Sequence, residues 1–145
     1  MSDKKIKFEI TTPERVVYSE EIEEAIIPTM NGEIGVLPNH IPLVSILKAG
    51  ELRIKKNGEE ESIAVSGGFI EVRPNKVVIL ADTAEKSDEI DEQKAEEARK
   101  NAEALIKEKR VDATDFAALS AKIEKELVRL KVVKKRRRKK PQVNL

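Results

Sequence analysis

The sequence predicts a β domain of about ten short strands, followed by a C-terminal antiparallel two-helix hairpin. Two observations carry this prediction. Up to about Thr83, apolar residues alternate with polar ones or form short β-branched runs, and turn-forming residues separate them. After Asp88 the composition shifts to Ala, Glu, Lys and Arg, with apolar residues three and four positions apart, the period of an amphipathic helix. Many short strands at this spacing are typical of a small sandwich or barrel.

Each strand is predicted from a short apolar pattern. Alternation marks four segments, and β-branched runs mark residues 16–18, 25–27 and 77–81. The alternating residues are Ile6, Phe8 and Ile10, then Leu52 and Ile54, Ile63 and Val65, and Ile70 and Val72. Turn signals separate the strands at Thr12-Pro13, Asn31-Gly32, Asn57-Gly58, Gly67-Gly68 and Pro74-Asn75. We expect type I′ turns at both Asn-Gly pairs, because both central positions of that turn need a positive φ.

Two helices follow the strands. The first is expected over residues 91–109, which contain no Gly, Pro or Val, and its apolar face is formed by Ala95, Ala98, Ala102, Leu105 and Ile106. The second is expected to start at Asp112 and to carry a stripe of Phe116, Leu119, Ile123, Leu127 and Leu130. The helices join near Arg110-Val111. Because one seam is mainly alanine, we expect a closed hairpin of only moderate stability. Opened into one rod, residues 88–133 would span about 70 Å.

Charge divides the chain into an acidic body and a basic tail. From Lys131 to the end there are eight basic residues and no acidic ones, although the whole chain has a net charge of only +1. The tail KKRRRKK at 134–140 is able to bind nucleic acid, an anionic membrane or an acidic protein, or to remain a solvated end. It lacks the interleaved aromatic residues that stack on bases. We therefore expect three parts: a β domain (1–86), a helical hairpin (87–133) and a basic tail (134–145).

The sequence offers no catalytic constellation. The chain has no cysteine and one histidine, His40, which excludes cysteine nucleophiles and multi-histidine metal sites. Phosphate-binding motifs of the GxxxxGK[ST] and GxGxxG types are absent. Gly67-Gly68 is interpreted as a bend or bulge rather than an anion site. No signal-peptide pattern or apolar run of ~18 residues occurs, so a soluble cytoplasmic protein is expected.

A series of motifs in fixed order resembles the epsilon subunit of bacterial F-type ATP synthases. The motifs are TPE, VY, PT, NGEIGVLPNHIPLV, LKAG, LRI, SGGF and PNKVVILADTAE, and together with the hairpin they cover nearly the whole chain. The resemblance implies a sandwich rather than a barrel. It also implies a non-catalytic central-stalk subunit of a proton-translocating ATP synthase, peripheral to the cytoplasmic face of the bacterial plasma membrane. No cofactor is required on this interpretation.

The resemblance further implies partners and surfaces. The β domain would bind the gamma subunit and the membrane rotor ring of c subunits, and the ring would contact Glu33, Pro38, Asn39, His40, Ile41 and Pro42. An extended hairpin would oppose ATP hydrolysis by contacting the alpha/beta catalytic head. Its basic face would be formed by Lys122, Lys125, Arg129, Lys131, Lys134 and Lys135. Nucleic acid is not an expected partner.

Nucleotide binding is a separate question. Some bacterial members of this family bind ATP as a regulatory ligand through an Ile-Asp-x-x-Arg-Ala motif and two arginines on the second helix. The matching residues here are Ile90, Asp91, Lys94, Ala95, Lys125 and Arg129. Two of the three arginines are lysines, which lack the planar fork that grips phosphate, so any ATP site is expected to be weak. Asp91 also fits a helix cap and Ala95 the helix seam.

Two other functions fit parts of the sequence. One is a cytoplasmic β-sandwich adaptor whose basic tail binds nucleic acid or anionic membrane. The other is a free-standing nucleotide sensor, in which ATP would stabilise the closed hairpin.

Overall fold

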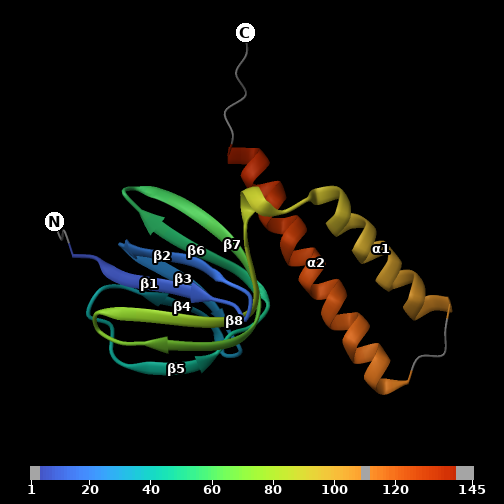
Figure 1. Ribbon diagram of the computed structural model, residues 1–145, viewed down its shortest axis with the longest axis horizontal. Helices are drawn as coiled ribbons and strands as arrows, with labels where there is room; N and C mark the ends of the chain where they lie inside the picture. The colour runs from blue at the N-terminus through green and yellow to red at the C-terminus, as the bar shows by residue number, and fades with distance from the viewer. Residues whose placement is uncertain (1–3, 109–111, 140–145) are drawn as a thin grey trace, which may run out of the picture.

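The computed structural model describes residues 4–108 and 112–139, with side chains as far as residue 136, and shows a β-sandwich beside a helical hairpin (Figure 1). Among the described residues there are eight strands, in the order β2-β1-β8-β7-β6-β3-β4, with β5 paired to β7. The fold class predicted from the sequence is confirmed. The strands are β1 (Ile6–Thr11), β2 (Val16–Ile22), β3 (Glu24–Thr29), β4 (Gly32–Val36), β5 (Leu43–Ile46), β6 (Gly50–Lys56), β7 (Glu59–Val72) and β8 (Lys76–Lys86).

Two long strands, β7 and β8, belong to both layers of the sandwich. The first half of β7 pairs with β6 and with the end of β8. Its second half pairs with β5 and with the start of β8, which in turn pairs in parallel with β1. The core between the layers is filled by residues from the predicted apolar patterns: Ile6, Phe8, Ile10, Leu52, Ile54, Ile63 and Ile70 from the alternating segments, and Ile79 from the β-branched run at 77–81.

The bend in β7 lies at Gly67-Gly68, and it explains why there are fewer strands than expected. Both glycines have positive φ, +59° and +118°, which lets the strand turn sharply while its pairing with β8 continues on either side. A Cβ at Gly68 would collide with the carbonyl oxygen of Leu80. The two segments expected on either side of the glycine pair are therefore one strand, and the sandwich has fewer, longer strands than about ten.

The two Asn-Gly turns differ. Asn57 and Gly58 both have positive φ, 53° and 79°, as a type I′ turn requires, and that prediction is confirmed. At Asn31-Gly32 it is wrong, because only Gly32 is in the left-handed region (φ 104°) and the loop residues are Met30 and Asn31. Thr29 stabilises this turn: its Oγ1 donates to the Gly32 carbonyl (2.6 Å) and accepts from the Asn31 N–H (3.2 Å).

The hairpin consists of α1 (Glu92–Glu108) and α2 (Ala113–Lys139), after a short 3₁₀ turn, η1 (Ser87–Glu89). Asp91 caps α1 by accepting from the Lys94 N–H (3.1 Å), and Asp112 caps α2 by accepting from the Asp115 N–H (2.8 Å). The predicted connection near Arg110-Val111 lies outside the described residues. Helix α2 continues to Lys139, so the first residues of the basic tail are helical.

The seam between the helices is narrower than expected. Ala95 and Ala102 are buried on α1, as predicted. Phe116 and Leu127 belong to the predicted apolar stripe of α2, but they remain 51% and 49% exposed. Small alanine side chains cover only part of a wide stripe of large ones, so this face of α2 is incompletely covered.

Helix α2, which lies between the sandwich and α1, provides the main contact between the two parts (Figure 1). Val132 and Val133 of α2 are buried with Ala64 of β7 and with Ile90, which lies between η1 and α1. Val128 packs against the same group. This second, smaller hydrophobic cluster holds the hairpin against the sandwich.

Candidate functional site

The loop between β4 and β5 contains five of the six residues expected to face the rotor ring. Asn39 has a φ of 68°, and its N–H donates to the Pro74 carbonyl (2.8 Å), which ties the loop to the β7–β8 turn. The His40 ring hydrogen-bonds through Nδ1 to the Ile41 carbonyl (2.7 Å), so His40 has a local structural role. The loop presents apolar Leu37 and Ile41 to solvent. The loop is thus held in shape by hydrogen bonds and exposes two apolar side chains.

Glu33 is separated from that loop. It lies at the start of β4, four residues from Leu37, and a strand of that length places it roughly 13 Å away. Its carboxylate pairs with Arg53 of β6 (3.2 Å). The structure therefore brings Pro38, Asn39, His40, Ile41 and Pro42 together but not Glu33 with them.

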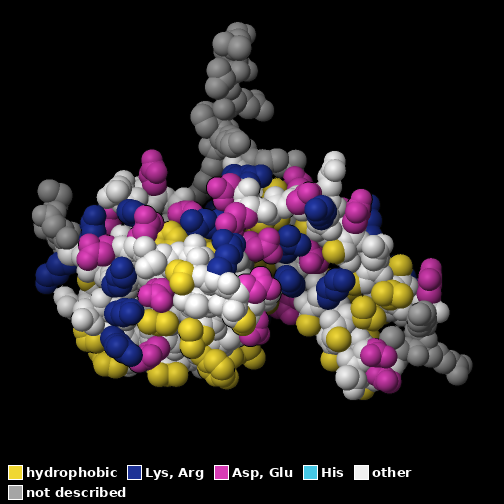
Figure 2. Space-filling model, viewed as in Figure 1, with side chains coloured by type: hydrophobic (Ala, Val, Ile, Leu, Met, Phe, Trp, Pro, Cys, Tyr) yellow, Lys and Arg dark blue, Asp and Glu magenta, His cyan; other side chains and the backbone are white. Residues whose placement is uncertain are grey.

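An apolar stripe crosses the outer face of one sandwich layer. Ile46, Phe69 and Leu80 are paired across β5, β7 and β8 and are 53%, 60% and 55% exposed. Val44, also exposed, lies next to this row. Figure 2 shows hydrophobic side chains gathered at the lower edge of the sandwich, where β5 lies in Figure 1. Contiguous exposed apolar surface of this kind marks an interaction site.

This stripe was not predicted from the sequence, although two segments carry a signal for it. In GGFI and VVILA the apolar residues are consecutive instead of alternating. A strand with one buried face needs only alternate apolar residues, so the extra ones, Phe69 and Leu80, indicate a second covered face.

Four of the six residues of the possible ATP site are already buried or hydrogen-bonded within the chain. Ile90 and Ala95 are buried in packing, and Asp91 caps α1. Arg129 is held by two carboxylates: its Nη2 donates to Glu85 (3.1 Å) and its Nη1 to Glu126 (2.7 Å). Burial alone would lower the pKa of Arg129, but the hydrogen bond and charge of Glu126 and the charge of Glu85 raise it above its usual value. Within the described chain, Lys94 and Lys125 have no ion pair.

The six basic residues expected on one face of α2 lie on two. At about 100° per residue, Lys122, Lys125 and Arg129 share one side of the helix, while Lys131, Lys134 and Lys135 lie on the other. Two of the six, Arg129 and Lys135, form ion pairs with the sandwich.

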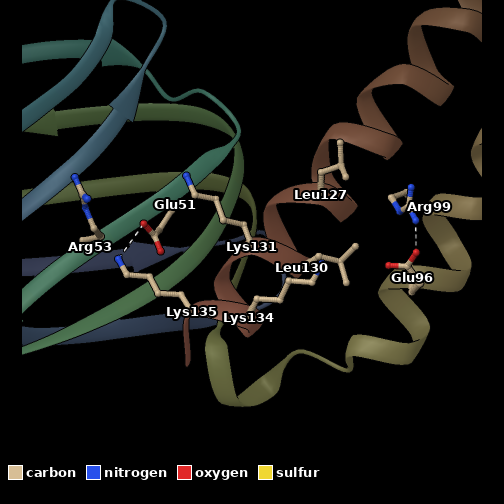
Figure 3. Close-up of a pocket in the computed structure, with 9 residues that line it drawn as sticks. All are labelled: Glu51, Arg53, Glu96, Arg99, Leu127, Leu130, Lys131, Lys134 and Lys135. Atoms are coloured by element: carbon tan, nitrogen blue, oxygen red, sulfur yellow. Dashed lines mark hydrogen bonds and ion pairs between the residues drawn. The ribbon is translucent and has the colours of Figure 1, made fainter. Parts of the chain in front are cut away.

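A groove of about 820 Å³ lies along α2, between β6 and α1 (Figure 3). Its floor includes Leu127 and Leu130, and charged side chains form its walls: Glu51, Arg53, Glu96, Arg99, Lys131, Lys134 and Lys135. Arg99 hydrogen-bonds Glu96 and lowers the pKa of that carboxyl. Most of these charges are spread along the groove rather than aimed at one point, so it is an open trough rather than a catalytic pocket.

Neither a metal site nor a membrane span is found in the part of the chain that the structure describes. No three His, Cys, Asp or Glu side chains there are placed to hold a metal ion. None of the described helices is long and apolar enough to cross a bilayer.

Comparison with protein families gives two adjacent matches. The model described as "ATP synthase, Delta/Epsilon chain, beta-sandwich domain" matches residues 5–87, and that described as "ATP synthase, Delta/Epsilon chain, long alpha-helix domain" matches residues 88–134.

Curated relatives agree. The ATP synthase epsilon chain of Dehalococcoides mccartyi is 50% identical over 139 residues, covering 96% of this chain and 99% of the relative. The epsilon chain of Herpetosiphon aurantiacus is 48% identical over 132 residues, with coverage of 91% and 96%.

Solved structures with a similar fold come from mitochondrial ATP synthases. A chain in the Euglena gracilis OSCP/F1/c-ring structure aligns with a TM-score of 0.71 at 26% identity, covering 87% of this chain and 83% of that one. A chain in the Tetrahymena thermophila central stalk/c-ring structure aligns with a TM-score of 0.57 at 12% identity, over 92% and 99% of the two chains, and shows a shared fold only.

Proposed function

The chain belongs to the delta/epsilon-chain family of ATP synthases, and from this premise we propose that it binds gamma and the ring of c subunits in the central stalk. It is a non-catalytic epsilon subunit of the complex. In that position it helps transmit rotation between the ring and the alpha/beta head, at the cytoplasmic face of the bacterial plasma membrane. We assign assembly to residues 1–86, regulation to residues 87–133 and further contact to the tail, 134–145.

The observation that carries the gamma contact is the apolar stripe of Ile46, Phe69 and Leu80. Three large apolar side chains, each more than half exposed, lie in one row across three strands. Because each side chain is already partly buried, covering its exposed part would contribute about half of the 1.5–3 kcal/mol of full burial, or about 1–1.5 kcal/mol. The three together favour a permanent partner over water. A stalk subunit that must stay attached while the rotor turns needs such a partner.

The loop of Pro38, Asn39, His40, Ile41 and Pro42 is the proposed ring contact. Its hydrogen bonds to the β7–β8 turn and within the loop hold its shape, and Leu37 and Ile41 offer apolar contact. Glu33, at the other end of β4, would contact the ring at a different place from this loop.

The hairpin is proposed to oppose ATP hydrolysis when it extends toward the head. Incomplete burial of Phe116 and Leu127 supports this, because a partner can cover apolar surface that α1 leaves open. Basic Lys122, Lys125, Lys131 and Lys134 have no ion pair within the described chain and remain available for acidic segments of the head. The basic tail would add to that contact.

ATP, if it binds at Ile90, Asp91, Lys94, Ala95, Lys125 and Arg129, is proposed to bind weakly. Phosphate would have to displace Glu85 and Glu126 from Arg129, and the lysines at 94 and 125 offer only point charges. The adaptor alternative has less support, because Lys135 and Arg136 of the basic tail already contact the sandwich.

The test is gamma binding by two substituted forms of the full chain and by one form that lacks residues 134–145. Phe69→Ser should weaken binding about 5- to 20-fold, because it removes from the proposed contact a side chain that is 60% exposed in the free chain. Phe116→Ser is the matched control, since Phe116 is similarly exposed but lies on α2, and it should bind normally. Removal of residues 134–145 should also leave gamma binding intact. Normal binding by Phe69→Ser would refute the proposed surface.

Salt-sensitive binding to DNA or lipid vesicles that disappears with residues 134–145 would favour the adaptor.

A further inference from the structure

The end of α2 is attached to the sandwich by charges as well as by the valine cluster. Between Glu126 and Arg136, three cations of α2 contact groups outside the helix, and each reaches a different place on the sandwich or on η1. Val132 and Val133 lie between them in the chain and are buried. The apolar contact is therefore bordered by specific polar contacts.

Arg129 forms the first contact. Its guanidinium forms one ion pair with Glu85, at the end of β8, and another with Glu126 of its own helix. The Glu126 side chain is only 5% exposed and that of Arg129 only 17%, so solvent screens this group weakly. The Glu85 carboxylate of the sandwich therefore pairs with Arg129, which without this pair could bind an external anion.

Lys135 forms the second contact, six residues further along α2. Its Nζ lies 3.2 Å from Glu51 of β6 and 3.0 Å from Glu60 of β7, and it therefore bridges two strands to α2. Figure 3 shows Lys135 and Glu51 pointing toward each other across the groove. Glu51 is almost fully buried, so without Lys135 its carboxylate would lose its cation in a place that water hardly reaches. Arg136 donates to the Ser87 carbonyl and completes the attachment.

The pairing is selective. Lys131 and Lys134 lie between these residues on the same helix, yet they have no ion pair within the described chain. The contacts to the sandwich therefore come from particular helix positions and not from a general attraction between a basic helix and an acidic body.

We propose that Arg129 and Lys135, paired with Glu85, Glu51 and Glu60, form an intramolecular charge latch that holds the hairpin closed without a nucleotide. Opening breaks these pairs and frees the same two cations for an acidic partner, so the closed latch and that external contact exclude each other. The consequence for ATP hydrolysis rests on the proposed function, but the latch is a property of the isolated chain.

The test measures how far the hairpin opens in the full-length chain. Because the native sequence has no cysteine, Glu14→Cys on the sandwich and Lys122→Cys on α2 provide two unique labelling sites for spin labels, and the distance distribution reports closed and open molecules. Without added nucleotide, the starting chain should be mainly closed. Glu51→Gln combined with Glu60→Gln should lower the closed-to-open ratio about tenfold or more, and Lys135→Met should do the same. Added KCl should lower the closed-to-open ratio of the starting chain by screening the partly exposed Lys135–Glu60 pair, and it should have a smaller effect on either variant, which lacks that pair.

Matched controls remove the same charge beside the latch. Glu59→Gln neutralises the neighbour of Glu60, and Lys134→Met the neighbour of Lys135; both should leave the distances unchanged. If the Glu51 variant fails to fold, Lys135→Met alone decides, since Lys135 lies on the helix surface rather than in the sandwich. Unchanged distances in Lys135→Met, an equal effect of the controls, or closure only after ATP is added would overturn the latch. Gamma binding by the same variants is measured in parallel, so failure of the latch and failure of the proposed function are distinguishable.

Discussion

Replacing Val132 by alanine should release the hairpin from the sandwich without unfolding either part. Val132 is fully buried in the small cluster with Ala64, Ile90 and Val133, which is separate from the main core. The substitution removes two methyl groups, each worth about 0.8 kcal/mol when buried, and the docked state therefore loses about 1.6 kcal/mol before any cavity penalty. That loss corresponds to an approximately 15-fold lower closed-to-open ratio.

The same substitution raises the intrinsic helix propensity of α2, so opening of the hairpin cannot be attributed to loss of the helix. Alanine favours helix over valine by about half a kcal/mol, so α2 itself should not become less helical. The assay is the distance between labels at Glu14→Cys and Lys122→Cys, together with circular dichroism. Leu127→Ala, on the half-exposed side of the same helix, is the control and should leave the distance unchanged. If Val132→Ala keeps the hairpin closed, or if it lowers helicity instead, the second cluster does not hold the hairpin as we infer.

Three further predictions concern stability. Gly68→Ala should destabilise the sandwich by about 2 kcal/mol or more in thermal melts, because the new Cβ meets the Leu80 carbonyl and φ is +118°. Asp112→Ala should lower the stability of α2 by about 1 kcal/mol, measured by helix content against temperature, because the Asp115 N–H loses its cap. Burial raises the pKa of the Glu61 carboxyl, with Asp88 and Glu20 adding to the effect, so the folded state disfavours its charged form. Glu61→Gln should therefore stabilise the protein against urea at neutral pH, and this gain should disappear as the pH falls through the folded-state pKa.

Much of the sandwich is readable from the sequence because its strands have one buried face. Ile6, Phe8 and Ile10 alternate with polar residues and are all fully buried in the structure. The helix starts at Asp91 and Asp112 are also predicted from nearby residues, since the capping carboxylate lies only three residues from the N–H that donates to it. Features that depend only on residues close together in the sequence, such as strand alternation and helix caps, can therefore be predicted from the sequence.

Other features depend on contacts that no local pattern contains. The bend predicted at Gly67-Gly68 is confirmed, but the sequence did not show that pairing with β8 on both sides makes the two flanking segments one strand, β7. Leu127 has the spacing of a seam residue, but its burial depends on what α1 offers, and α1 offers alanine. Lys135 is expected from charge alone to face a partner, yet it pairs with Glu51, 84 residues away in the sequence.

The measurement that tests the account most directly is ATP hydrolysis by a catalytic head that contains gamma but lacks its epsilon subunit. The full-length chain is added to one sample and a chain ending at Lys86 to another, after binding of both is confirmed. The separate core of the sandwich predicts that residues 1–86 still bind gamma. Only the full-length chain is expected to slow hydrolysis. If both forms bind and neither slows it, or if both slow it equally, the helical hairpin is not a brake.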